Sequence, residues 1–324
     1  MNGQRSAISV APGGVFMALF AMALLTTPSA EAASTKCDRA CLEKILNQYL
    51  EAVVTHNPAG APLAADFRYT ENAIVVKPGE GLWKSATALG TVQRHYLDAV
   101  SGQAAYFGHI EEGAGSATKT GIATLRIRVV DRQITEGELV MGRPGEGLLS
   151  VDGLTAHPPP PSAPQAKREK SERPSRKAMV TAANSYFDGL QNHDGSHVLE
   201  QKGCVRIENG VTTAGQPFLA PGAPIPATVA GAPPVSEDCA ANMEVFKATI
   251  AAIDHRRFPV MDEEAGVVLG MVVFNRPPGA KRPDGAPFPR NLLTEIFAID
   301  HNRIKGIYAA MHYMIPDVPD APGW

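Results

Sequence analysis

Three side chains in the first half of the chain have the types and spacing needed for acid–base chemistry. Tyr69 and Glu71 are two residues apart, so on a β-strand they share one face. His109 lies in a strand-like stretch and alternates in phase with Phe107, which places its imidazole where an aromatic ring points. We therefore predict that Tyr69, Glu71 and His109 are catalytic acids and bases. The alternatives are a half-exposed strand histidine and a glutamate that anchors a turn.

Six further residues are candidates for the walls of a binding site. They are Trp83, His95 and Tyr106 in the first half, and Arg206, Glu208 and His312 in the second half. Arg206 and Glu208 are in phase along a strand, so they form either one side of a second, more polar pocket or an ion pair within one strand. His312 ends the last predicted strand, where a surface histidine is the alternative.

The sequence carries no motif for a metal, a cofactor or a nucleotide. It contains none of Gly-x-x-x-x-Gly-Lys, Gly-x-Ser-x-Gly and His-Glu-x-x-His. His193, His197 and Glu200 are loosely spaced, and the Asp194-Gly195 turn interrupts them. A net charge of −3 leaves no basic footprint for nucleic acid. We expect no metal, no cofactor and no nucleic-acid partner, and a small molecule as the ligand.

An internal repeat organises the chain. One ungapped offset of 137 residues places Tyr49 over Tyr186, His56 over His193, and Glu71-Asn72 over Glu208-Asn209. With small gaps the correspondence continues at Asp98 over Asp262, Val130 over Ile299, and Ile134 over Ile304. Each copy starts with apolar residues at helical spacing and continues with strand-like runs. Each half is therefore predicted to be helices first and then an antiparallel sheet.

The predicted strands are the apolar, β-branched runs of each copy. They cover residues 67–76, 104–110, 121–130 and 134–141 in the first copy, and 205–208, 267–274, 292–299 and 304–311 in the second. Basic residues, Arg94-His95 and His255-Arg256-Arg257, precede the second long strand of each copy. We expect them at solvated helix ends; the alternative is that they hold a carboxylate or phenolate at the mouth of a pocket.

Residues 1–32 are predicted to be a signal peptide. Arg5 precedes an apolar run of eleven residues, shorter than the roughly 20 that a membrane span needs, and Ala30-Glu31-Ala32 fits a signal peptidase site. We expect cleavage after Ala32 and a periplasmic or secreted protein with no membrane attachment; the alternative is an uncleaved N-terminal anchor. The two repeats are then residues 33–154 and 177–324, joined by a Pro-rich and charged linker at 155–176.

The four cysteines are compatible with an oxidising compartment. Cys204 and Cys239 flank a loop rich in Gly and Pro, and a bridge across it would remove loop entropy worth roughly 4 kcal/mol. We predict this disulfide. Cys37 and Cys41 are four residues apart, where a bridge is possible but strained, so two free thiols or a bond to another loop remain open.

The order of elements in each half resembles the SnoaL-like or NTF2-like family, whose fold is an α+β cone. Three segments, 203–210, Asp238-Cys239 and 255–258 with Asp262-Glu263, resemble a family of secreted, mostly fungal two-repeat proteins of unknown function. This resemblance covers nearly all of the mature chain. It implies that Cys204 pairs with Cys239. That family often has a cysteine near residues 104–106 of the first half, which this sequence lacks.

The resemblance implies an α+β protein with two tandem NTF2-like domains, each with N-terminal helices packed on a curved antiparallel sheet around an apolar cavity. It also implies enzymes that need no cofactor. The predicted function is an exported lyase or isomerase that acts by general acid–base chemistry on a small, largely apolar molecule such as an aromatic one. The alternative is a non-catalytic periplasmic protein that binds a small molecule or serves as a scaffold. The chain would be a monomeric pseudo-dimer or a homodimer.

Overall fold

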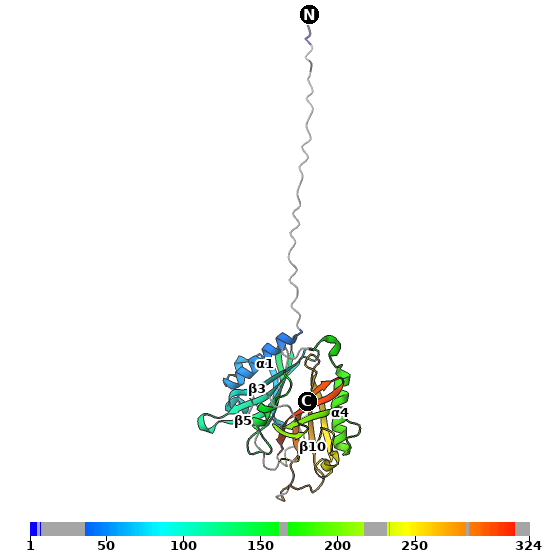
Figure 1. Ribbon diagram of the computed structural model, residues 1–324. Coiled ribbons are helices and arrows are strands. Elements are labelled where there is room, and N and C mark those ends of the chain that lie inside the picture. Colours follow the sequence, from blue (N-terminus) through cyan, green and yellow to red (C-terminus); the bar gives the residue numbers. More distant parts are fainter. Residues whose placement is uncertain are drawn as a thin grey trace. The chain divides into compact units, whose positions relative to one another are not determined.

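The computed structural model of the 324-residue chain describes residues 1–4, 7, 36–161, 168–216, 232, 234–282 and 285–314 (Figure 1). Most of the predicted signal peptide, including its cleavage site, lies outside the described residues. Residues Thr35–Trp324 form one compact unit. No helix in the described part of the chain is long and apolar enough to cross a membrane.

The unit is an α+β structure with two six-stranded sheets. The first sheet and its flanking helices comprise α1 (Arg39–Val54), η1 (Pro58–Gly60), β1 (Leu63–Glu71), β2 (Ile74–Val75), α2 (Leu82–Ser85), β3 (Ala86–Asp98), β4 (Gln103–Glu112), η2 (Gly115–Ala117), β5 (Lys119–Val130) and β6 (Gln133–Gly142). The second sheet and its helices comprise α3 (Val151–Ala156), η3 (Lys170–Glu172), α4 (Arg176–Asn192), β7 (Glu200–Glu208), β8 (Val211–Ala214), η4 (Met243–Ala248), β9 (Ala252–Asp262), β10 (Val267–Asn275), β11 (Asn291–Asp300) and β12 (Arg303–Tyr313).

Both sheets have the same strand order. It is β2-β1-β6-β5-β4-β3 in the first sheet and β8-β7-β12-β11-β10-β9 in the second. The pairs β1–β6 and β7–β12 are parallel and the other pairs are antiparallel, so the sheets are mixed rather than purely antiparallel as predicted. The two sheets lie on either side of the predicted linker, which is consistent with two tandem domains.

Two long strands, β3 and β9, fall where the sequence predicts helix ends. Arg94 and His95 lie within β3, and Arg256 lies within β9. Both strands carry polar residues on their outer face and shift register against their neighbour, between Leu89 and Gln93 in β3. These irregularities break the alternation of apolar residues on which strand prediction depends.

The two long helices start and stop with the same devices. Asp38 caps α1 and Ser175 caps α4, each accepting a hydrogen bond from a first-turn amide. His56 and His193 then take positive φ angles of 55° and 58° just beyond the helices. Nδ1 of His56 donates to the Trp83 carbonyl (2.6 Å), and Nε2 of His193 donates to the Ile250 carbonyl (2.8 Å). These histidines are structural, and their contacts make Trp83 and Ile250 equivalent positions.

An asparagine clamp fixes the edge of each sheet. Asn72 has a φ of 48°, donates to the Met141 carbonyl (3.2 Å) and accepts from the Met141 amide (2.9 Å). Asn209, with a φ of 46°, makes the same two bonds to Met311, both 2.8 Å long. Met141 and Met311 therefore correspond, an offset of 170 residues. Both copies carry a bulge at the same place, so Val129, rather than Val130, lies over Ile299.

The two sheets pack face to face, and helices α1 and α4 cover their other faces. Side chains from both sheets form one apolar core, including Phe107 and Ile122 from the first sheet and Leu269 and Ile296 from the second. Thr124 and Thr294 are equivalent under the offset of 170 residues. The Thr294 hydroxyl donates directly to the Thr124 hydroxyl, 2.6 Å away. Identical positions that meet are typical of a contact with two-fold symmetry.

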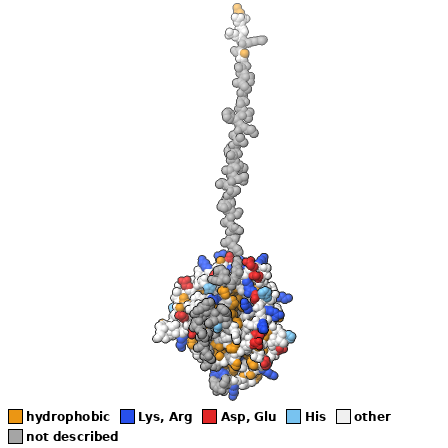
Figure 2. All heavy atoms as spheres, viewed as in Figure 1, with side chains coloured by type: hydrophobic (Ala, Val, Ile, Leu, Met, Phe, Trp, Pro, Cys, Tyr) orange, Lys and Arg blue, Asp and Glu red, His pale blue; other side chains and the backbone are white. Residues whose placement is uncertain are grey.

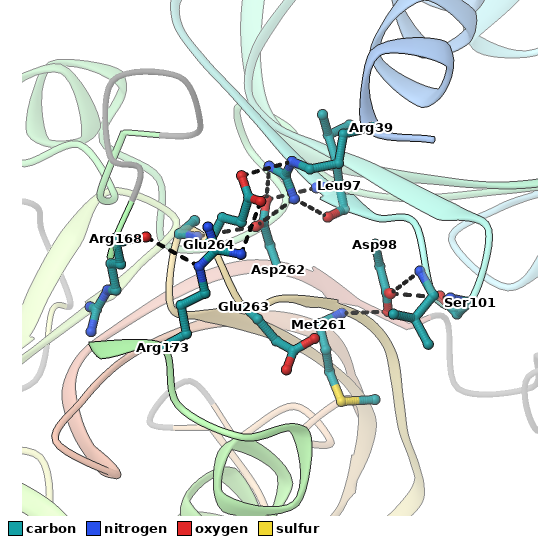
Figure 3. A network of polar contacts seen from close by, with 12 residues as sticks. Arg39, Leu97, Asp98, Ser101, Arg168, Arg173, Met261, Asp262, Glu263 and Glu264 are labelled. Atoms are coloured by element: carbon teal, nitrogen blue, oxygen red, sulfur yellow. Dashed lines mark hydrogen bonds and ion pairs between the residues drawn. The ribbon is translucent and has the colours of Figure 1, made fainter. Parts of the chain in front are cut away.

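Crossed ion pairs connect the halves at the ends of β3 and β9, and Figure 3 shows the one between Arg39 and Asp262. Arg39 at the start of α1 binds Asp262 through two hydrogen bonds of 2.8 and 3.0 Å. Arg176, which lies 137 residues after Arg39, binds Asp98 at 2.8 and 2.7 Å. Each carboxylate also accepts a backbone amide from the opposite half, Leu97 on Asp262 and Met261 on Asp98. Each half therefore neutralises a buried aspartate of the other.

Disulfides join Cys204 to Cys239, the predicted pair, and Cys37 to Cys41, the pair that the sequence leaves open. Their sequence separations are 35 and 4 residues. Serine substitution of Cys204 and Cys239 together is expected to lower the free energy of unfolding about 2 kcal/mol more than the same change at Cys37 and Cys41, because loop-closure entropy grows with loop length. Urea unfolding of both double variants measures this difference. Equal losses would show that loop length does not decide the contribution.

Charged side chains are mixed on the surface. On the face shown in Figure 2, basic and acidic side chains are interspersed rather than gathered by sign. This agrees with the small net charge of −3.

Candidate functional site

The second half contains a cavity of about 660 Å³ on the helix-covered side of its sheet. Its apolar walls include Phe246, Ile250, Phe274, Phe288 and Met311. Its polar groups include Glu208, Arg276, Asn291 and Tyr313. A volume between about 300 and 1,000 Å³ with mostly apolar walls and a few polar groups is typical of small-molecule sites.

The alternation of side chains along the strands aims these residues into the cavity. Odd-numbered residues of β11 and β12, such as Asn291, Met311 and Tyr313, point to the helix side, whereas their neighbours Leu292 and Ala310 point to the first sheet. η4 and the loop after β10 supply the outer walls. The segment after β6, Gly145 to Leu148, closes one side, so the first half contributes to the cavity of the second.

Glu208 is one of two carboxylates on the cavity wall; the other, Glu146, comes from the first half and also contacts His312. The side chain of Glu208 keeps 17% of its accessible surface, and its nearest cation is Nε of Arg206, at 4.0 Å. Arg206 itself is buried, and it donates to the Thr213 hydroxyl (2.9 Å) and to the Tyr186 hydroxyl (3.1 Å). The Arg206 guanidinium is thus fixed behind Glu208 by neutral partners.

Glu295 lies in the same polar cluster and is completely buried. Neither oxygen of its carboxyl group has a hydrogen-bond partner among the described residues. Burial raises the pKa of Glu295 to about 8, and the charge of Glu208 adds to this effect while Arg206 opposes it. Glu295 therefore holds a proton at neutral pH and is an acid rather than an anion.

The equivalent space in the first half is filled by aromatic rings. Trp83 lies where the second half has Ile250, and Tyr69 lies where it has Arg206. The Tyr49 and Trp83 ring centroids are 5.1 Å apart, and all three rings are buried. Leu125 lies in this core at the position of Glu295.

Glu71, the equivalent of Glu208, is occupied by donors from the protein. It accepts from the Tyr69 hydroxyl (2.9 Å) and from the Leu82 amide (2.6 Å). Gly81, with a φ of +58°, leaves room for this carboxylate, since a Cβ there would lie 2.5 Å from it. Burial raises the pKa of Glu71, and the two donors oppose that shift. Glu208 has no such donors among the described residues, so its oxygens remain available to a ligand.

The three predicted catalytic residues do not surround one space. Tyr69 and Glu71 lie together on the helix side of the first sheet. His109 is in phase with Phe107, as predicted, but that face packs against the second sheet. There His109 is buried beside Thr91 (3.4 Å), and burial lowers its pKa to about 4. The imidazole is therefore separated by the sheet from Tyr69.

The predicted wall residues divide between the cavity and other places. Glu208 lines the cavity, and Arg206 is buried behind it. Trp83 and Tyr106 are buried in the first core, and the ring of His95 lies 5.9 Å from that of Tyr106. His312 points the other way from β12, toward Asn72 (3.1 Å) and Glu146 (3.3 Å) of the first half. His312 therefore lies at the contact between the two halves and not in the cavity.

Several cavity residues have no counterpart in the sequence-based prediction. They are Arg276, Asn291, Phe246 and Phe288, and the buried Glu295 of the neighbouring polar cluster was missed as well. Glu295 leaves one signal in the sequence, because it is the single charge within the apolar run from Leu292 to Ile299. A lone charge in a strand buried on both faces points to a functional or a structural exception.

One group of potential metal ligands occurs among the described residues: Glu200, Cys204 and Cys239. The two cysteines form a disulfide and have no thiolate to offer. The group therefore does not fit a metal ion.

Comparisons with known proteins cover parts of the chain. The model of a family described as "Domain of unknown function (DUF8021)" matches residues 172–311. This range contains most of the residues that line the cavity. A crystal structure of a protein from Sphaerobacter thermophilus is 15% identical, with a TM-score of 0.27, over 41% of this chain and 94% of that one. AclR from Streptomyces galilaeus, described as a putative hydroxylase, is 13% identical, with a TM-score of 0.28, over 33% of this chain and 82% of its own. Among curated proteins, none matches the chain.

Proposed function

We propose that the second half binds a small, largely apolar molecule in its cavity and that the protein is an exported, cofactor-independent lyase or isomerase. The observation that carries this proposal is the contrast between two equivalent glutamates. Glu71 is held by two protein donors beneath a core of aromatic rings, whereas Glu208 faces an open cavity and accepts no hydrogen bond from a described residue, with the Arg206 guanidinium 4.0 Å away. In this scheme both halves are NTF2-like domains, at residues 33–154 and 177–324, and they form a pseudo-dimer.

Glu208 is the general base in this scheme. It removes a proton from a carbon of the ligand that lies next to an electron-withdrawing group, and the electron pair moves onto that group. Burial raises the pKa of Tyr313, so its hydroxyl stays protonated and donates to the developing negative charge. An isomerase returns the proton to another carbon of the ligand, and a lyase expels a leaving group instead.

Two disulfides support export, because such bonds persist in oxidising compartments such as the periplasm or the extracellular space. The predicted signal peptide points the same way.

A matched pair of variants tests the proposed function. The first step is a thermal-shift screen of the mature protein against small apolar metabolites, followed by mass spectrometry of each ligand after incubation. Glu208→Gln is expected to retain ligand binding and lose about 10²-fold or more in turnover, because the base is removed and the shape is kept. Glu71→Gln is expected to keep turnover within about threefold.

The opposite pattern is equally informative. Turnover that survives Glu208→Gln and is lost in Glu71→Gln or in Tyr69→Phe would assign the reaction to the first half, as the sequence predicts.

A protein that only binds is the second candidate. The observation that favours it is that no histidine is among the described residues lining the cavity. Saturable binding with no chemical change of any ligand, in the wild type and in both variants, would establish this alternative.

A further inference from the structure

Arg276 is a half-buried arginine that, like Arg206, has only neutral hydrogen-bond acceptors among the described residues. It follows β10 and lines the cavity. Its Nε donates to the Pro289 carbonyl (2.7 Å) and one terminal nitrogen donates to the Thr249 carbonyl (2.7 Å), while the other contacts Oδ1 of Asn291. All three acceptors are neutral. Arg39, Arg126, Arg143, Arg176 and Arg257, in contrast, each bind a carboxylate.

The charge of Arg276 thus has no anionic partner among the described residues. Burial lowers its pKa to about 10, and the more distant groups of Tyr313 and Glu208 only partly oppose this. A desolvated cation is costly unless an anion accompanies it. An anion that enters the cavity would remove this cost, so the cavity selects for negative charge at this end.

The guanidinium is already oriented for such a partner. Its central carbon lies 4.2 Å from the ring centroid of Phe288, and the three hydrogen bonds fix its plane. Of its five N–H groups, three are used, which leaves one on each terminal nitrogen. Two N–H groups in a fixed plane match the two oxygens of one carboxylate.

The rest of the cavity limits what the carboxylate can be attached to. Phe246, Phe274 and Tyr313 supply flat aromatic walls, which favour a planar, apolar body. Glu208 lies on the same cavity and repels a second negative group. The lining contains two arginines, Arg276 and Arg282, and two carboxylates, Glu146 and Glu208, so a phosphate would add about two negative charges to a balanced set, whereas a carboxylate adds one.

We propose that the cavity binds a small monocarboxylic acid with a planar apolar body, its carboxylate on Arg276 and its body between the aromatic walls. This inference rests on the proposed function, in that the same cavity is the ligand site. It makes Arg276 the residue that determines specificity, and it places the carbon that loses its proton to Glu208 within the body of the acid.

Calorimetric titration of the mature protein with charged and neutral probe pairs tests this proposal. The probes are benzoate with benzamide and cinnamate with cinnamamide, with inorganic phosphate as a further anion. Each carboxylate is expected to bind about tenfold or more tightly than its amide, and phosphate is expected not to compete. Equal affinity for carboxylate and amide, or displacement of the carboxylate by phosphate, would overturn the proposal.

Variants of Arg276 then test whether its guanidinium is the group that binds the carboxylate. Arg276→Gln is expected to weaken the carboxylates about tenfold or more and to leave the amides unchanged, and Arg276→Lys is expected to restore part of the loss. Arg256→Gln removes an arginine that pairs with Asp188 instead, and it serves as the control. A loss of the amides together with the carboxylates in a folded Arg276→Gln would contradict the assignment. If Arg276→Gln does not fold, the comparison of probe pairs on the wild type decides.

The outcomes separate this inference from the proposed function. Tight binding of amides and carboxylates alike refutes the carboxylate site and leaves an apolar ligand site in place. Selective binding of carboxylates without any turnover supports the carboxylate site and refutes the enzyme. Absence of binding by every probe counts against the carboxylate site, while the metabolite screen still decides the proposed function.

Discussion

Asp262→Ala is expected to lower the free energy of unfolding by about 3–5 kcal/mol, because it removes the anion from a buried ion pair. The Asp262 carboxylate is fully buried, binds Arg39, and accepts the amides of Leu97 and Ala265 at 2.9 and 3.1 Å. The substitution leaves two buried amides without an acceptor and the Arg39 charge without its partner. Urea unfolding followed by far-UV circular dichroism measures the loss.

The equivalent aspartate provides the control. Asp98 binds Arg176 and accepts the amides of Val100, Ser101 and Met261. Asp98→Ala is therefore expected to lower the free energy of unfolding by a similar amount. The unfolding curve of each variant is expected to remain a single transition, because each aspartate lies in one half and bonds residues of the other. A loss below about 1 kcal/mol, or two separate transitions, would mean that the crossed ion pairs do not couple the halves.

Glu295→Leu is expected to stabilise the protein at pH 8 while changing its stability much less at pH 5. Burial raises the pKa of Glu295 to about 8 in the folded chain, from the ordinary value of 4.5 for a glutamate. As the pH rises, the unfolded chain loses this proton at about pH 4.5, whereas the folded chain keeps it until about pH 8. Between these two values the free energy of unfolding of the wild type therefore falls with rising pH. The loss is on the order of 4 kcal/mol, and it is absent below that range. Leucine cannot ionise, and it is the residue that the first half has at the equivalent position, Leu125.

The measurement is the free energy of unfolding from urea denaturation at several pH values between 5 and 9. Burial and the nearby Asp238 raise the pKa of Glu200 to about 8 as well, so the wild-type profile contains both carboxyl groups. The difference between wild type and Glu295→Leu isolates Glu295. Parallel profiles for the two proteins would show that Glu295 does not ionise on unfolding in this range. Leu125→Glu, the reverse exchange, is expected to introduce the same pH dependence into the first half.

The sequence was a good guide to what is repeated and a poor guide to what differs. His56 and His193, and Asn72 and Asn209, have equivalent places because the side chains of each pair bond backbone groups at corresponding points of their copies. Strands rich in apolar residues over most of their length, such as β5 and β11, were predictable. β3 and β9 were not, because bulges and solvent-facing polar residues interrupt their pattern. The parallel pairing of β1 with β6 depends on tertiary packing and leaves no local signal.

The candidate site was predictable only in part. Arg206 and Glu208 were identified from their alternation along one strand. Which half has an open cavity depends on the size of one side chain, Trp83 in the first half and Ile250 in the second. These two positions correspond only through their contacts with His56 and His193, which the sequence does not reveal. Arg276 and Phe288 meet through a loop, so no periodic pattern places them together.

The hydrogen bond between Thr124 and Thr294 has a consequence for how such a site can arise. In a dimer of two separate, identical chains, the threonines at this contact would come from one gene, and every substitution would enter both cavities at once. Here the partners belong to one polypeptide, so their association does not depend on dilution. The first half can therefore keep a buried tryptophan, Trp83, that stabilises its core. The equivalent space in the second half can remain open and be lined with charged side chains that bind a ligand.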